Sequence, residues 1–410
     1  MDQKLFYRRV NSQKYNLHLL CQRIIFRCNL YIFKILGLAP SKINVSIIFE
    51  NGLYRNNLGY PNETSITGAF YNVFLIVALC VYIVVLQIYH LSAVEQLDST
   101  ITQIVGKSIL IFGLVGVIAI WFIYIYYQKV IVEISNELYM LDNYLKRYKY
   151  YLSEKDFGVY FMFVGNFIIW TSLISLGAFT YFSETSLLWT IPHLISSWIL
   201  IQYALILNFI IQRFRSLNKT ILKLGKLNLD TEFETIFVSK IKIHESAVTD
   251  IMNINYANRK LCEICNQVAD FYALPILIAI IYGMTTVIFS SYHIFMSFVT
   301  NNYGDFSYIV RIECSSIILM AFFNFVALIS NAIRVTREVK KTPSYIHLLL
   351  DHCATNLKVK KWLLEFSRDL LHRNVELSAY GVIVLDDFLL QTICGTITTY
   401  LIILIQFRLK

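Results

Sequence analysis

One face of the last apolar run, residues 388–407, could line a path for ions. Thr392, Thr396, Thr399, Ile403 and Gln406 follow one another at alternating steps of four and three residues. That spacing places them on one side of a helix, and this side is polar except for Ile403. A row of hydroxyl and amide groups suits the wall of a water-filled pore. The alternative is that the hydroxyls bond back to their own helix or to a neighbouring one.

The two ends of this face carry different chemistry. Gln406 and Phe407 lie at the end of the run, and an apolar ring at that end of a pore can shut it by excluding water. Glu376, Asp386 and Asp387 lie before or at the start of the run. Acidic rings favour cations, but an acidic residue directly before a helix is also a common cap. Both interpretations of the acidic residues stay open.

A second group of residues combines aromatic walls with a few polar groups, as small-molecule pockets do. These residues belong to three other apolar runs, and they are Trp170, Trp189, His193, Trp198, Gln202 and His293. His193 follows Pro192, and a proline inside a spanning helix opens space between helices. We therefore rank His193 first as a ligand contact. The alternative for the Trp residues is the aromatic belt that many membrane proteins place at the interface.

Motifs of known enzyme chemistry do not occur in the sequence. It contains no P-loop, no dinucleotide-binding glycine motif, no zinc-protease motif and no nucleophile elbow. Cys262 and Cys265 have the spacing of a zinc-binding pair, but no second pair follows. We expect no enzyme activity, no cofactor and no metal site.

The composition indicates a membrane protein. Of the 410 residues, 57% are hydrophobic and 15% are charged, whereas soluble domains carry about 25% charged residues. A water-soluble core cannot bury so many apolar side chains, which excludes a soluble enzyme and a disordered chain. The net charge is +9, but the basic residues lie between the apolar runs. They therefore predict membrane topology and no nucleic-acid partner.

Seven uncharged runs are long enough to cross a bilayer as helices, which takes about 20 residues. They are Ala69–Leu91, Ser108–Gln128, Phe157–Phe182, Leu187–Ile211, Phe271–Val299, Cys314–Ile333 and Phe388–Phe407. The expected fold class is all-α, a polytopic membrane protein with seven transmembrane helices.

The basic residues also set the direction of the spans. Alternate gaps between the runs hold 32 Lys and Arg residues on one side and 4 on the other. We therefore expect the N-terminus inside the cell and the C-terminus outside. Three sequons, at Asn44, Asn62 and Asn218, fall on the expected cytoplasmic side, where no glycan is added.

The expected cytoplasmic gaps keep a helical periodicity. Apolar residues recur at steps of three and four after the second and fourth runs and before the fifth and seventh, as in Val359, Leu363 and Phe366. We expect long cytoplasmic helix extensions, which form either a bundle within one chain or a contact between subunits.

Four segments follow from this reading of the chain. They are a cytoplasmic N-terminal segment with an interfacial helix (1–68), transmembrane helices 1–6 with their cytoplasmic extensions (69–333), cytoplasmic helices (334–387), and a pore-lining helix 7 with a short extracellular tail (388–410).

The end of the chain is similar to the signature of the insect gustatory receptors. Thr399 and Tyr400 are followed by five aliphatic residues and then by Gln406 and Phe407. The match is complete over nine positions and lies at the end of the seventh run, where the family has it. The length, the seven spans and the inside N-terminus also resemble this family, which belongs to the insect chemoreceptor superfamily of ligand-gated channels.

The resemblance implies a tetrameric, non-selective cation channel opened by a small tastant. The seventh helix would line the pore, the cytoplasmic extensions would hold the subunits together, and each subunit would have a ligand pocket. The branch that detects common sugars usually has Glu after Thr-Tyr, whereas this chain has Leu401. The resemblance therefore favours a fructose-type or bitter ligand.

The implied partners are the tastant, permeating cations, the lipid bilayer, and further copies of the chain or other gustatory receptors. The implied location is the plasma membrane of sensory neurons. Two other classes stay possible from the residues: a seven-span receptor that signals through a G protein, and a solute transporter. The predicted direction of the spans is opposite to that of G-protein-coupled receptors, and the sequence has no internal repeats of the kind found in transporters.

The direction of the spans can be tested with epitope tags. We expect a C-terminal tag on intact cells to bind antibody, and an N-terminal tag to bind it only after permeabilisation, because of the asymmetry in basic residues. A C-terminal tag that is reached only after permeabilisation would rule out this topology.

Overall fold

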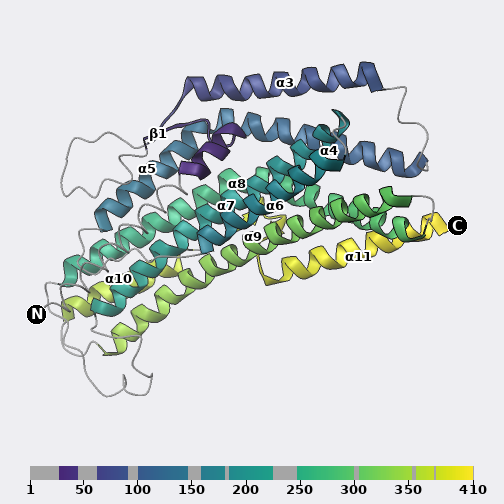
Figure 1. Cartoon of the computed structure of the whole chain (residues 1–410). Helices are drawn as coiled ribbons and strands as arrows, with labels where there is room; N and C mark the ends of the chain where they lie inside the picture. The colour runs from purple at the N-terminus through teal and green to yellow at the C-terminus, as the bar shows by residue number, and fades with distance from the viewer. Residues whose placement is uncertain are drawn as a thin grey trace, which may run out of the picture. The chain divides into compact units, whose positions relative to one another are not determined.

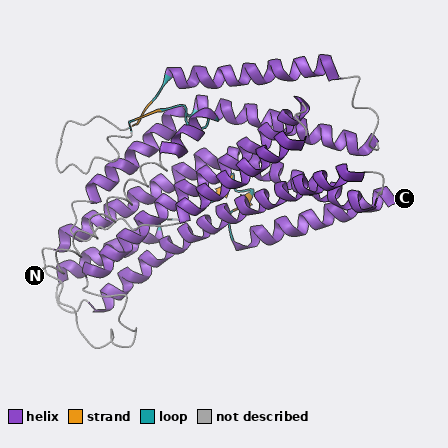
Figure 2. Ribbon diagram, in the orientation of Figure 1, coloured by secondary structure: helices purple, strands orange, loops and turns teal. Residues whose placement is uncertain are grey.

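A computed structural model describes residues 27–44, 62–90, 100–145, 158–180, 184–224, 247–299, 304–352, 357–373 and 375–409. The described part of the chain is almost entirely helical, with only two short strand pairs (Figures 1 and 2). It forms two compact units. The first contains Met1–Leu91 and Ile118–Val132, and the second contains Ser92–Val117 and Glu133–Lys410.

The helices are α3 (Ile66–His90), α4 (Thr100–Tyr126), α5 (Gln128–Leu145), α6 (Gly158–Thr180), α7 (Glu184–Leu224), α8 (Ala247–Val299), α9 (Gly304–His352), α10 (Leu357–Leu371) and α11 (Asp387–Leu409). The antiparallel strand pairs are β1 (Lys42–Ile43) with β2 (Asn62–Glu63), and β3 (Ser378–Ala379) with β4 (Ile383–Val384).

Seven helices carry the apolar runs that the sequence predicts. Among the described residues, six helices are long and apolar enough to cross a membrane: α3, α4, α7, α8, α9 and α11. The seventh, α6, has a shorter apolar stretch, Phe161–Ser175. The predicted all-α polytopic membrane fold is confirmed.

Several helices begin earlier than the apolar runs predicted. Helix α4 begins eight residues before the predicted Ser108, and α9 begins ten residues before the predicted Cys314. The prediction stopped at Lys107 and near Arg311 because it required an uncharged window. A single charged side chain does not end a helix, and Lys107 is exposed to the surroundings.

The first unit fixes the end of a short N-terminal helix, residues 27–35. The last carbonyl groups of a helix lack partners within it. Asn72 Nδ2 of α3 donates to the carbonyl oxygen of Gly37 at 2.9 Å, and Trp121 Nε1 of α4 donates to that of Leu36 at 2.9 Å. Side chains from α3 and α4 therefore hold this helix end in place.

The second unit is built around three long helices. Helices α7, α8 and α9 pack against one another, α6 covers α7 and α9, and both α10 and α11 pack on α8 and α9 (Figure 1). The three have 41, 53 and 49 residues, which corresponds to about 60, 80 and 74 Å. A bilayer core is about 30 Å thick, so these helices extend well beyond it, as predicted.

The apolar stripes of these extensions are buried within the single chain. Seven side chains from the predicted stripes of α7 and α10 are each at most 1% exposed: Ile210, Phe214, Leu217, Ile221, Val359, Leu363 and Phe366. Their charged neighbours occupy the other faces. The stripes therefore form a bundle within one chain, which was one of the two interpretations left open.

A short hairpin interrupts the segment 334–387, which the sequence predicted to be helical. The amide of Val382 donates to the carbonyl of Ala379 at 3.0 Å, and the two central residues have positive φ, 53° for Tyr380 and 68° for Gly381. That turn joins strands with their natural twist, and glycine adopts such a conformation without strain. The sequence analysis missed this turn, although the glycine was a visible signal.

The buried stripe of α10 can be tested by placing charge in it. We expect Leu363→Asp with Phe366→Asp to lower the free energy of unfolding by roughly 3–5 kcal/mol or more, because both side chains are buried and a carboxylate there has no partner. The measurement is thermal unfolding of the purified protein in detergent. The control is Lys360→Asp with Lys361→Asp, which adds the same groups at exposed positions of α10. Equal stability of the two variants would contradict the packing.

Candidate ligand pocket and pore-facing helix

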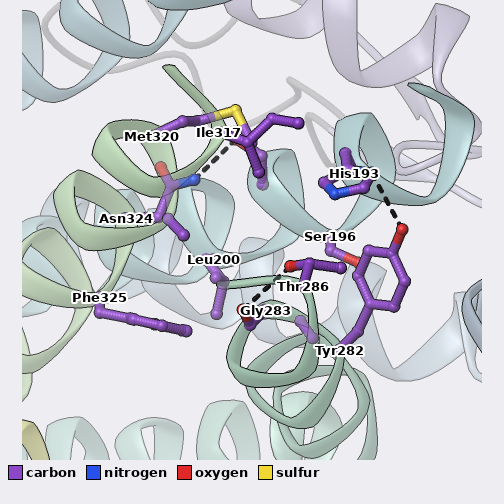
Figure 3. A pocket seen from close by; sticks show the side chains of 13 residues that line it. His193, Ser196, Leu200, Tyr282, Gly283, Thr286, Ile317, Met320, Asn324 and Phe325 are labelled. Carbon is purple, nitrogen blue, oxygen red and sulfur yellow. Dashed lines mark hydrogen bonds between the residues drawn. The ribbon is translucent and has the colours of Figure 1, made fainter. Parts of the chain in front are cut away.

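A small cavity lies between α7, α8 and α9 (Figure 3). Four lining residues come from α7, four from α8 and five from α9: His193, Ser196, Ser197 and Leu200; Ala279, Tyr282, Gly283 and Thr286; and Ile317, Met320, Ala321, Asn324 and Phe325. Its volume is about 20 Å³, which is room for about one water molecule. Most drug-sized ligands need pockets of about 300–1,000 Å³, so the side chains must move to admit one.

At Gly283 the ring of Phe325 packs directly against the backbone of α8. A Cβ atom built on Gly283 would lie 2.8 Å from the Cζ atom of the Phe325 ring. Any larger residue would therefore displace the ring. The ring reaches the backbone of α8 only because glycine stands there, and this contact joins α8 to α9 beside the cavity.

His193 is tied to its own helix and to α8. Its Nδ1 atom lies 2.6 Å from the carbonyl oxygen of Trp189 and 2.9 Å from the hydroxyl of Tyr282. A carbonyl oxygen can only accept, so Nδ1 carries the ring proton and the Tyr282 oxygen is its second acceptor. The hydroxyl proton of Tyr282 is then able to donate to another group. Figure 3 shows the two side chains facing each other at one side of the cavity.

A buried hydrogen-bond network lies at the other side. The hydroxyl of Ser197 donates to Asn166 Oδ1 at 2.9 Å and accepts from Trp170 Nε1 at 3.0 Å and from Asn324 Nδ2 at 2.9 Å. All four side chains are at most 4% exposed. The network links α6, α7 and α9 and fixes the position of Asn324.

The six pocket residues that the sequence predicted have different places in the structure. Only His193 lines the cavity, while Trp170 lies behind it in the network. Trp189 stacks on Phe289 at 6.0 Å between ring centres, and His293 lies 4.4 Å from the same ring. Trp198 packs on Phe163, and Gln202 is buried. The cavity does not bring these six residues together.

Sequence analysis missed most of the lining, including Tyr282, Asn324 and Phe325. These residues lie inside apolar runs and have no special spacing in the sequence. An available signal was Asn324, one of two amides in a mostly apolar run, because polar groups within spans often have a specific role.

The predicted polar face of α11 is largely uncovered in the single chain. Thr392, Thr399 and Gln406 are exposed, Ile403 is 39% exposed and Thr396 is half-buried. The hydroxyls of Thr392 and Thr399 donate to the carbonyls of Phe388 and Gly395 at 3.0 and 2.9 Å. The hydroxyl protons thus bond to their own helix, while the oxygen atoms stay on the exposed face. The side chain of Phe407 lies outside the described residues.

The acidic residues before α11 have separate roles in the fold. Asp386 Oδ1 accepts from the amides of Phe388 and Leu389 at 3.1 Å each, so Asp386 caps the helix. Glu376 and Asp387 are exposed. The alternative interpretation of a helix cap therefore applies to Asp386, whereas the side chains of Glu376 and Asp387 remain accessible.

Comparison with known protein families gives a match over most of the chain. A family model described as 7tm chemosensory receptor matches residues 26–410. Two similar proteins from Drosophila melanogaster are named putative gustatory receptor 28b, 24% identical over 152 residues, and putative gustatory receptor 28a, 27% identical over 168 residues. These stretches cover 36% and 40% of this chain and 32% and 36% of the relatives. The chain therefore matches about a third of the length of these curated relatives.

Solved structures share the fold at low sequence identity. The insect olfactory receptor OR5 from Machilis hrabei is similar with a TM-score of 0.61, and its complex with eugenol with a TM-score of 0.59. In both cases the identity is 13%, and the match covers 95% of this chain and 99% of the other.

The hydrogen bond between Tyr282 and His193 can be tested by removing the hydroxyl oxygen of Tyr282. We expect Tyr282→Phe to lower the free energy of unfolding by about 1 kcal/mol, because it removes a buried hydrogen bond and leaves the ring in place. The measurement is the thermal midpoint of the purified protein. Tyr308→Phe is the control, since Tyr308 is 65% exposed. Equal midpoints for both variants would show that this hydrogen bond does not stabilise the fold.

Proposed function

The chain belongs to the 7tm chemosensory receptor family, and we propose that it is a gustatory receptor that works as a ligand-gated, non-selective cation channel. Its helices make it a multi-pass membrane protein. The proposed location is the plasma membrane of sensory neurons.

The exposed face of α11 is the observation that carries this proposal. Only about a tenth of its apolar stretch is buried by the rest of the chain, 11%, against 83% for α7. The helix bears the nine-residue signature and turns Thr392, Thr399 and Gln406 outward. One helix cannot enclose a pore, so several copies must bring their α11 helices together. We propose four copies, as the resemblance to gustatory receptors implies, either as a homotetramer or with other gustatory receptors.

A leucine stripe on α10 supports assembly. Leu357, Leu364 and Leu371 recur every seven residues on the side of α10 away from its buried stripe, and they are 87%, 50% and 82% exposed. A seven-residue apolar repeat is typical of helices that pack against other helices. We propose that this stripe contacts neighbouring subunits.

The pore would select and gate ions with residues at both ends of α11. Glu376 and Asp387 are exposed near its start, where a ring of carboxylates would attract cations. Asp386 contributes charge there in addition to its capping role. Thr392, Thr396, Thr399 and Ile403 would line the path, and Gln406 with Phe407 would form the gate at the outer end.

The tastant would act through α8 and α9. The cavity lies between α7, α8 and α9, and α11 packs on α8 and α9. A ligand that widens the cavity by moving α8 or α9 moves a helix on which α11 rests. The ligand therefore has a direct mechanical route to the pore helix. We propose a bitter or fructose-type ligand for this site, and the eugenol bound by OR5 is a reason to screen small aromatic compounds as well.

A membrane patch can separate the proposed channel from other receptor types. We expect a ligand to evoke current in an excised patch without nucleotides or cytosol, with a linear current–voltage relation and no coupled solute flux. A current that needs guanine nucleotides would instead indicate a receptor that signals through a G protein. Coupled flux of a solute would indicate a transporter.

The gate can be tested at Phe407. We expect Phe407→Ala to raise the ligand-free current at least about tenfold, because a smaller side chain no longer excludes water from a narrow apolar ring. The measurement is whole-cell current normalised to the amount of receptor at the surface. The control is Phe388→Ala, the same change at the opposite end of α11. If Phe407→Ala receptors reach the surface, stay closed without ligand and respond normally, the gate lies elsewhere.

A further inference from the structure

The lining of the α7–α9 cavity mixes apolar and polar residues and has no Asp, Glu, Lys or Arg side chain. Six of its thirteen residues carry hydrocarbon, thioether or phenyl side chains: Leu200, Ala279, Ile317, Met320, Ala321 and Phe325. A charged ligand would lose its water there without meeting an opposite charge. The lining therefore favours an uncharged ligand with an apolar body.

Several polar groups of the lining already have partners. The Ser197 oxygen accepts two hydrogen bonds and its proton goes to Asn166. The hydroxyl of Thr286 donates to the carbonyl of Gly283 on its own helix at 3.0 Å. The Tyr282 oxygen accepts from His193, which leaves the Tyr282 hydroxyl proton and the Ser196 hydroxyl for a ligand. These are fewer positions than a ligand with many hydroxyl groups needs.

Asn324 offers a buried acceptor, because half of its amide is unused. Its side chain is 1% exposed, and Nδ2 donates to Ser197. Its Oδ1 atom is buried and accepts no hydrogen bond from the part of the chain that the structure describes. Buried polar atoms nearly always have a partner. Asn324 lines the cavity (Figure 3), and its Oδ1 acceptor lacks only a donor.

We infer that the cavity selects a small, uncharged, mostly apolar ligand that donates one hydrogen bond to Asn324 Oδ1, such as a phenol or an alcohol. This inference rests on the proposed function and names its ligand class. It disfavours sugars, because a hexose brings several hydroxyl groups into a lining with few free partners. Each buried hydroxyl without a partner lowers affinity about tenfold.

A ligand would widen the cavity by displacing apolar side chains of its wall. Met320 and Ile317 lie in the same wall of the cavity as Asn324 (Figure 3). Methionine has three rotatable bonds and adapts readily to a new neighbour. The network around Ser197 keeps Asn324 in place meanwhile. The polar contact therefore orients the ligand, and the apolar wall adapts to its size.

The test compares a ligand that has the donor with its methyl ether, in which a methyl group replaces the donated proton. Purified receptor is titrated with para-propylphenol and with its methyl ether, and binding is followed by thermal stabilisation. We expect the phenol to bind at least about tenfold more tightly, because the ether cannot donate to Asn324. D-fructose serves as the sugar and is expected to bind more weakly than the phenol.

Two variants assign the difference to Asn324. Asn324→Leu should bring the ratio of the two dissociation constants close to one. Asn258→Leu is the matched control, the same change at a buried asparagine of α8 outside the cavity whose Oδ1 atom also accepts no hydrogen bond from the described residues, and it should leave the ratio as in the unmodified protein. The comparison of ligands on the unmodified protein needs no variant, so it stands even if Asn324→Leu fails to fold.

The outcomes separate this inference from the channel proposal. Equal binding of phenol and ether, tighter binding of D-fructose, or no binding of either aromatic ligand overturns the inference. A ratio that stays high in a folded Asn324→Leu protein overturns it as well. The phenol could bind more tightly in a way that depends on Asn324 and yet evoke no current in patches. This result would support the ligand class and contradict the channel proposal.

Discussion

The packing of α7 against α9 is the contact on which the rest of the second unit depends. In a bilayer, lipid is as apolar as leucine, so apolar surface alone does not hold helices together. Polar side chains join α7 to α9 at three depths instead. Ser197 bonds to Asn324, Asn208 to Asn331 and Asn218 to Thr342. Each bond requires the same register of the two helices, so together they fix one arrangement.

The register between α7 and α9 is the same within the apolar stretches and in the water-exposed extensions beyond them. Beyond the apolar stretches, water surrounds the chain, and there the burial of apolar stripes such as Phe214 and Phe366 stabilises the bundle. The Asn218 side chain lies beside the buried stripe of α7: it donates to the carbonyl of Glu338 and accepts from Thr342. Because both of its polar ends are used and it is 3% exposed, Asn218 cannot carry a glycan in the folded chain. Its sequon therefore gives no information on the direction of the spans.

Features that depend on residues close together in the sequence could be predicted. Features that depend on how the helices pack against one another could not. Apolar runs and three- and four-residue stripes are local patterns, so the seven helices and their buried stripes could be predicted. The cavity could not, because Tyr282 and Asn324 come together only when α8 and α9 pack. Trp170 and Trp198 have the types of a pocket lining, but neither lines this cavity: Trp170 bonds to Ser197, and Trp198 packs on Phe163. The polar face of α11 was visible as a spacing, whereas the use of its hydroxyl protons within the helix needed coordinates.

Two adjacent residues of α9 connect the cavity to the helix that would form the pore. Asn324 bonds to α7 through Ser197, and Phe325 rests on Gly283 of α8. A change in the size of the cavity therefore acts on α9 through two neighbouring positions, one held by a hydrogen bond and one by close contact. Separating α9 from α7 breaks the hydrogen bond between Asn324 and Ser197. Separating α9 from α8 only shifts the Phe325 ring over Gly283, which costs less because no polar group loses its partner. The weaker side of the cavity is thus the one between α8 and α9, and these are the two helices on which α11 rests. In the proposed channel, this asymmetry would direct the movement caused by a ligand toward α11 rather than toward α7.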